Sequence, residues 1–216
     1  MPGAPVMHSK DLVNWKTVSY VFPSLHDTPK YDMNGGTVYG RGQWATSIRY
    51  VDGTYYIYFS PNDEPFKGYV YTSKDPRKGW TLAHRIPHFH DASLFFDDDK
   101  RAYIFYGTGE MKELMPDLSG VKPGGRQGKV FERDEEETGL LEGSRFIKHD
   151  GRYYLIMISW PNGKPRRQVC YRADNIEGPY EKKVILESTF GGFPYAGKGT
   201  IAVYYTHLTL PTNREG

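Results

Sequence analysis

The chain has 216 residues, of which 25% are charged, and its formal net charge is only +2 at pH 7. This length suits one domain with a sizeable core or two small ones, and the near balance of charge argues against nucleic acid as a partner. Aromatic residues make up 15% of the chain, and it contains 24 Gly and 15 Pro, which argues against a long helical bundle. No apolar stretch approaches the roughly 18 residues of a membrane span, so no membrane partner is expected.

Three stretches, taken in chain order, repeat one pattern of a short apolar strand, a turn rich in Asp and Gly, and an aromatic second strand. They are residues 50–60, 95–107 and 146–159. Asp52-Gly53 and Asp150-Gly151 are strong signals for two-residue hairpin turns, because Gly readily adopts the positive φ that such turns need. The three adjacent acids at 97–99 are expected to form a solvated turn rather than a metal site.

The spacing of these hairpins indicates the fold. They begin at residues 50, 95 and 146, which are 45 and 51 residues apart. Repeats of 45 to 51 residues, each with about four strands, are typical of the blades of a β-propeller. No long stretch has the 3.6-residue apolar period of a helix. A β-sandwich is the alternative, although it usually has shorter and more evenly spaced strands.

Two carboxylates differ from the turn acids by their position directly before the first strand of a hairpin. They are Asp91, in the run HDASLFF, and Glu142, in the run LLEGSRF. In a propeller the innermost strands line one channel, so acids from different blades can meet at its mouth. A carboxylic acid beside apolar walls and a second acid holds its proton more tightly, and can therefore act as a proton donor. His90 precedes Asp91, and strand alternation predicts that its side chain points away from that of Asp91.

Five short runs together resemble glycoside hydrolase family 43, the five-bladed β-propeller enzymes that act on xylan and arabinan side chains. They are PGAPV at 2–6, HSKDLVNW at 8–15, GQWA at 42–45, DASLFFDDD at 91–99 and LEG at 141–143. The resemblance covers roughly residues 2–201, which would supply about three and a half blades of an all-β, incomplete propeller. Thr46 and Ser144 stand where the family usually has Pro.

The resemblance implies roles for the residues that match these runs. Glu142 would be the general acid that protonates the departing oxygen, and Asp91 would orient Glu142 and tune its proton affinity. Trp44 would stack against or wall the sugar at the non-reducing end. The implied reaction is inverting hydrolysis that releases terminal xylose or arabinose from oligosaccharides of the xylan or arabinoxylan type. No cofactor is required, and the resemblance leaves open a central calcium or sodium ion in a complete propeller. Trp160 is expected to pack in the core or against a loop.

The two ends of the chain depart from the family pattern. The family's general base is an Asp ahead of the PGAPV run, and here that run begins at Pro2. We therefore expect a propeller domain over 1–201 that is truncated and nearly inactive without its base, followed by a non-native or disordered tail over 202–216.

Three other functions are compatible with a propeller of this sequence. One is a non-catalytic carbohydrate-binding propeller, which would keep the fold without the chemistry. Another is a protein-interaction propeller, which would not need both acids. The third, a retaining propeller glycosidase that acts on fructans, has its acids in different motifs. The sequence leaves open the compartment and the choice between xylose and arabinose.

Overall fold

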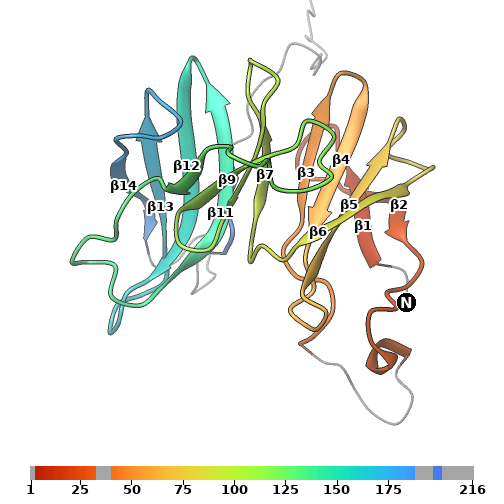
Figure 1. Ribbon diagram of the computed structural model, residues 1–216. Coiled ribbons are helices and arrows are strands. Elements are labelled where there is room, and N and C mark those ends of the chain that lie inside the picture. The colour runs from red at the N-terminus through yellow and green to blue at the C-terminus, as the bar shows by residue number, and fades with distance from the viewer. Residues whose placement is uncertain (1–2, 33–39, 188–196, 201–216) are drawn as a thin grey trace, which may run out of the picture.

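The structure is a computed structural model that describes residues 3–32, 40–187 and 197–200. The expected tail over 202–216 lies outside these residues. Within the described part of the chain no helix has the length and apolar character to cross a membrane. Apart from the 3-10 helix η1 (Pro29–Asp32), the regular elements are the strands β1 (Gly3–His8), β2 (Lys16–Phe22), β3 (Ser47–Val51), β4 (Thr54–Phe59), β5 (Lys67–Ser73), β6 (Thr81–Pro87), β7 (Ser93–Phe96), β8 (Ala102–Tyr106), β9 (Glu110–Leu114), β10 (Gln127–Lys129), β11 (Leu140–His149), β12 (Arg152–Trp160), β13 (Arg167–Ala173) and β14 (Glu181–Glu187) (Figure 1).

The strands form antiparallel sheets in which each strand pairs with its neighbour in the sequence. Three sheets have four strands, β3 to β6, β7 to β10 and β11 to β14, and β1 pairs with β2 alone. The first two strands of each four-stranded sheet are the hairpins that the sequence predicted. Asp52 and Gly53 both have positive φ (47° and 75°), as do Asp150 and Gly151 (48° and 74°), which confirms the two-residue turns.

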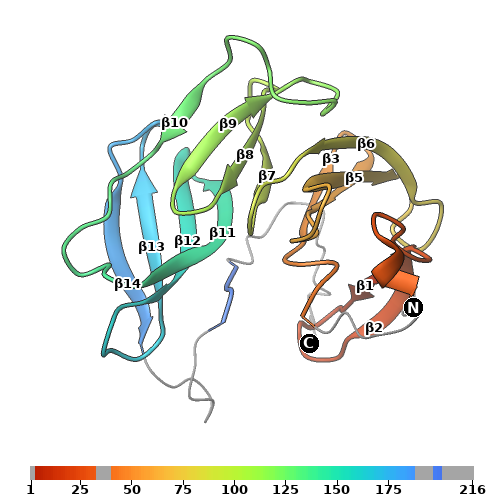
Figure 2. The same ribbon diagram turned by 60° about the horizontal axis from the view of Figure 1, so that its bottom comes forward.

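The sheets are arranged in an arc, in which the first strands of the three four-stranded sheets, β3, β7 and β11, follow one another (Figure 2). Strand β7 contacts both β3 and β11, although these strands belong to three different sheets. A set of four-stranded meanders that meet along their first strands is the arrangement of propeller blades. The predicted incomplete β-propeller is therefore confirmed, with three four-stranded sheets and one two-stranded sheet among the described residues.

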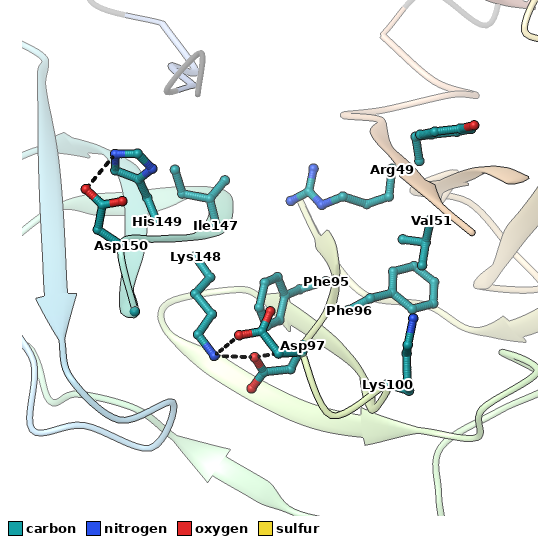
Figure 3. Close-up of a pocket in the computed structure, with 13 residues that line it drawn as sticks. Arg49, Val51, Phe95, Phe96, Asp97, Lys100, Ile147, Lys148, His149 and Asp150 are labelled. Carbon is teal, nitrogen blue, oxygen red and sulfur yellow. Dashed lines mark hydrogen bonds and ion pairs between the residues drawn. The ribbon is translucent and has the colours of Figure 1, made fainter. Parts of the chain in front are cut away.

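The turn acids 97–99 are only partly solvated, so the prediction for this turn was half right. Lys100 N–H donates to the Asp97 carbonyl at 3.0 Å, which closes the turn. The Asp97 side chain is only 9% exposed, whereas that of Asp98 is 85% exposed. Asp97 accepts a hydrogen bond from Lys148 at 2.8 Å (Figure 3). It also accepts one from the Tyr153 hydroxyl at 2.7 Å. The first acid of the run thus links the β7–β8 turn to the next sheet.

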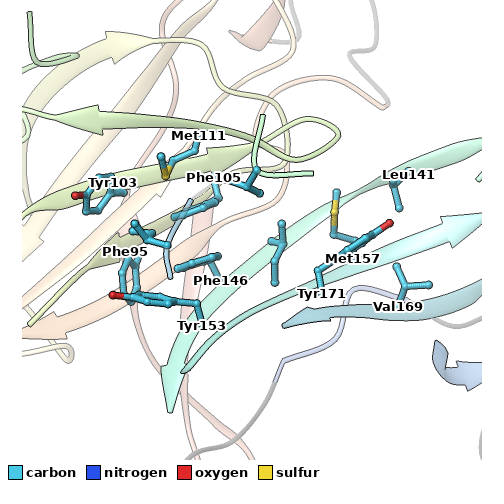
Figure 4. Close-up of a cluster of buried hydrophobic side chains, with 13 residues drawn as sticks. Phe95, Tyr103, Phe105, Met111, Leu141, Phe146, Tyr153, Met157, Val169 and Tyr171 are labelled. Atoms are coloured by element: carbon cyan, nitrogen blue, oxygen red, sulfur yellow. The ribbon is translucent and has the colours of Figure 1, made fainter. Parts of the chain in front are cut away.

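Each pair of neighbouring sheets is joined by its own hydrophobic core. Between the sheet of β7 to β10 and the sheet of β11 to β14, the rings of Phe105 and Phe146 stack with centroids 3.5 Å apart, and Phe95 meets Phe146 edge to face (Figure 4). Burying one such side chain stabilises a fold by about 1.5–3 kcal/mol. Separate clusters, centred on Leu94 and Phe59, join the other two pairs of sheets.

A chain of hydrogen bonds also ties the three first strands together. Leu94 N–H of β7 donates to Ser47 Oγ of β3 at 3.0 Å, and Phe146 N–H of β11 donates to Ser93 Oγ of β7 at 3.0 Å. Arg49 Nη2 donates to Ser93 Oγ at 2.9 Å and to the Phe146 carbonyl at 2.6 Å. These bonds hold β3, β7 and β11 beside one another, and Asp91 lies just before β7 and Glu142 near the start of β11.

Candidate functional site

The structure brings Asp91 and Glu142 together. Asp91 lies two residues before β7, and Glu142 is near the start of β11 in the next sheet. One carboxylate oxygen of each, together with a ring nitrogen of His90, lie within 4.8 Å of one another. The convergence predicted from the propeller geometry is therefore present.

The backbone around each acid departs from regular strand geometry. Asp91 has a φ of 49°, in the left-handed region that non-glycine residues rarely adopt. The register of β11 against β12 shifts between Glu142 and Arg145, and Gly143 within that shift has a φ of 78°. A bulge of this kind redirects the neighbouring side chain, and it leaves that of Glu142 31% exposed.

His90 lies in the same group, contrary to the prediction. Its Nε2 is 3.2 Å from Oε2 of Glu142, and its side chain is 33% exposed. The alternation argument was wrong because His90 and Asp91 precede β7 and do not belong to a strand. The positive φ of Asp91 also breaks the simple up-and-down order of side chains. The signal in the sequence for this contact was the position of His90 directly before Asp91.

Trp44 lies at the edge of this group rather than in a core. Its side chain is 41% exposed, and its ring centroid is 6.0 Å from that of His90. An exposed indole beside carboxylates suits a sugar, because the ring offers an apolar face and the acids offer polar contacts. Trp160, at the end of β12, is also exposed, and the Arg166 guanidinium lies 4.7 Å above its ring.

Three basic side chains act on the same region. Lys198 is exposed, yet partial desolvation lowers the pKa of its ammonium, and the charges of Arg145 and Arg49 lower it further. Asp91 and Glu142 oppose this effect by raising the Lys198 pKa. Arg145 Nε also donates to Thr200 Oγ1 at 2.8 Å.

The group of His90, Asp91 and Glu142 has the residue types of a metal site, but its surroundings fit a proton-handling site better. Nearby Lys and Arg charges repel a cation, and one oxygen of Glu142 is already hydrogen-bonded to His90. The central calcium or sodium ion stays a prediction, and we assign none of the described residues to it.

A cavity of about 500 Å³ lies at the opposite end of the first strands. It is lined by the hairpin turns and by Arg49, Phe95 and Ile147, and neither Asp91 nor Glu142 borders it. Its Lys148 is paired with Asp97 (Figure 3). Because the charges in this cavity are paired, we place the chemistry at the acids instead.

Comparison with known proteins gives a consistent assignment. The sequence profile of Glycosyl hydrolases family 43 matches residues 1–197. A beta-xylosidase of Formosa agariphila is 31% identical over 86% of this chain, and a putative beta-xylosidase of Xylanibacter ruminicola is 34% identical over 90%. The matched segments are 36% and 37% of those relatives, so the chain spans about a third of their length.

Solved structures agree with the sequence relatives. The fold matches a bifunctional GH43-CE protein from Bacteroides eggerthii with a TM-score of 0.80 and 41% identity, over 91% of this chain and 26% of that one. It also matches an engineered GH43 glycoside hydrolase with a TM-score of 0.77 and 26% identity, over 92% of this chain and 40% of that one. These neighbours are five-bladed propellers, of which the chain covers a part.

Proposed function

Because the chain belongs to glycosyl hydrolase family 43, we propose that its protein hydrolyses the O-glycosyl bond of a terminal xylose or arabinose in xylan-type oligosaccharides. Support comes from the beta-xylosidases named above and from a non-reducing end alpha-L-arabinofuranosidase of Bacteroides ovatus, which is 31% identical over 83% of this chain. The observation that carries the proposal is the meeting of Asp91 and Glu142, far apart in the sequence, beside the exposed indole of Trp44.

Glu142 is the general acid in this proposal. Its carboxyl donates a proton to the glycosidic oxygen as the bond from that oxygen to the sugar's anomeric carbon breaks. Water then adds to the anomeric carbon and gives up a proton to a base. Asp91 lies beside Glu142 and orients its carboxyl toward the glycosidic oxygen. Trp44 walls one face of the bound sugar.

The distance between the two acids limits their roles. In inverting enzymes the acid and base carboxyls are about 6.5–9.5 Å apart, and in retaining enzymes about 5–5.5 Å. One carboxylate oxygen of Asp91 lies within 4.8 Å of one of Glu142, which is too close for the acid and base of an inverting enzyme. We therefore assign Asp91 as the residue that orients Glu142, and we assign the base to none of the described residues. The same short distance would suit a nucleophile, which makes retention the second candidate.

The test uses the protein that carries this sequence, with aryl β-D-xylosides and aryl α-L-arabinofuranosides as substrates. Glu142→Gln should lower kcat on a substrate with a poor leaving group by about 10²–10⁴-fold. The exposed Glu181→Gln, in β14, is the matched control and should keep its rate. Proton NMR of the sugar first released by the wild-type protein should show the inverted anomer. Retention would make Asp91 the nucleophile, and binding without hydrolysis by the wild type would support a non-catalytic propeller.

A further inference from the structure

His90 connects the region before β7 to the acid of the next sheet. Its Nε2 is 3.2 Å from Oε2 of Glu142, and both side chains are about one third exposed. A hydrogen bond at this distance links a side chain ahead of β7 to one on β11, 52 residues later in the sequence. Nothing in the proposed reaction uses His90 itself, so its contact with Glu142 calls for a separate explanation.

The imidazole of His90 has two aromatic neighbours. The Trp44 ring lies 6.0 Å away at 50°, and the His88 ring lies 6.4 Å away at 28°. His88 is anchored in turn, because its Nδ1 lies 2.7 Å from Ser60 Oγ and 3.1 Å from the Pro61 carbonyl. These contacts restrict rotation of the His90 ring and aim its Nε2 at Glu142.

We propose that His90 is a positioning residue for Glu142, with Nε2–H donating to Oε2 so that the transferable proton stands on Oε1. This inference rests on the proposed role of Glu142 as the general acid. Before transfer, the bond is an ordinary one to a carbonyl-type oxygen. After transfer, the same N–H faces a carboxylate, and a charge-assisted bond is roughly twice as strong. His90 therefore stabilises the state that follows proton donation more than the state that precedes it.

The first experiment compares leaving groups. A 2,4-dinitrophenyl glycoside needs little help from an acid, whereas xylobiose, or the matching arabinosyl disaccharide, needs it fully. His90→Phe keeps a ring beside Trp44 and His88 but removes the donor, while His90→Gln keeps an N–H that can reach Oε2. His90→Phe should lose about tenfold or more in kcat on the disaccharide, within the 10²–10⁴-fold that a general acid contributes, and much less on the dinitrophenyl glycoside. His90→Gln should recover part of the loss.

The control is His149→Phe, the same change at the other end of β11, where His149 pairs with Asp150 at 3.3 Å. It should give no dependence on the leaving group. Equal losses by His90→Phe on both substrates, or no loss on either, would overturn the positioning role. If Glu142→Gln also shows no leaving-group dependence, the proposed acid itself fails, and the two failures are thereby distinguished.

A measurement without turnover completes the test. Long-range ¹H–¹⁵N spectra of histidine-labelled protein report which ring nitrogen carries the proton. The wild type should show His90 with its proton on Nε2, and Glu142→Leu should change that pattern. The same spectrum of His90 in both proteins would refute the contact whether or not the protein is active.

Discussion

Ser93 and Phe146 join two sheets through one buried hydrogen bond, in which the Phe146 N–H donates to Ser93 Oγ at 3.0 Å. Ser93 opens β7 two residues after Asp91, and Phe146 follows Glu142 by four residues on β11. The bond therefore lies just behind the two acids and sets the separation of the strands that carry them. Arg49 from β3 donates to the same hydroxyl at 2.9 Å.

We predict that Ser93→Ala lowers the free energy of unfolding by about 2 kcal/mol, because it leaves the buried Phe146 N–H without its acceptor. Ser144→Ala is the matched control. Ser144 is equally buried, but its hydroxyl has no hydrogen-bond partner among the described residues. Its removal should be neutral or slightly stabilising. Urea denaturation measures both variants, and equal losses would contradict the role given to Ser93.

We predict that Gly143→Ala disturbs the acid more than it disturbs the fold. An alanine at a φ of 78° costs about 1–2 kcal/mol, and its Cβ would lie 3.2 Å from Cδ1 of Ile158. The bulge that directs Glu142 would shift, and activity should fall by at least about tenfold, since misplacement by about 1 Å can cost 10²-fold.

The control for this variant is Gly163→Ala. Gly163 has a similar φ of 72°, but no atom lies within 4 Å of the position that an alanine methyl group would take there. Thermal denaturation should show comparable destabilisation of the two variants, and kinetics should show loss of activity in Gly143→Ala alone. Full activity in Gly143→Ala would mean that the bulge does not direct Glu142.

The two neighbouring turn acids should differ sharply in their contribution to stability. Burial alone would raise the pKa of Asp97, but the hydrogen bonds from Lys148 and Tyr153 lower it overall. Asp97→Asn weakens both bonds and should cost about 1–3 kcal/mol. Asp98→Asn changes an exposed acid next to it and should stay within about 0.5 kcal/mol. Similar values from chemical denaturation would show that this turn is solvated throughout.

A buried ion pair between Glu137, just before β11, and Arg167 of β13 should make the free energy of unfolding depend on pH in the acid range. Burial raises the pKa of Glu137, but hydrogen bonds from Ser159, Lys182 and Arg167 outweigh it and leave the pKa below its usual range. The Arg167 guanidinium donates to Glu137 Oε1 at 2.9 Å. A carboxyl with a lowered pKa stabilises the fold above its unfolded value of about 4.3, and this contribution is lost as the pH falls toward the folded pKa.

Glu137→Gln removes that titration. The free energy of unfolding of the wild type should therefore fall more steeply below about pH 4.3 than that of Glu137→Gln. The exposed Glu181→Gln provides the comparison for an acid paired only at the surface. Urea denaturation at several pH values between about 5 and 3 measures this dependence. Parallel curves of unfolding free energy against pH for the wild type and Glu137→Gln would argue against the ion pair as a source of acid sensitivity.

The local elements of this protein follow from short runs of its sequence. Asp52-Gly53 and Asp150-Gly151 specify their turns, because the positive φ that each turn needs depends on those residues alone. The aromatic strands beside them pair with their nearest neighbours in the sequence. The hairpins, their repeat and the position of Asp91 and Glu142 before first strands could therefore be predicted.

Contacts between sheets were decided only by the tertiary structure. From the sequence we predicted that the His90 side chain points away from that of Asp91 and that Asp97 is solvated. Both predictions were wrong because each considered only the residue's own strand or turn. The structure instead pairs His90 with Glu142 and Asp97 with Lys148, each across two sheets. Local backbone preference fixes where a side chain starts, but its partner depends on which sheet packs beside it. The hydrophobic cores between the sheets determine which sheets pack together, and the residues of each core come from distant parts of the chain.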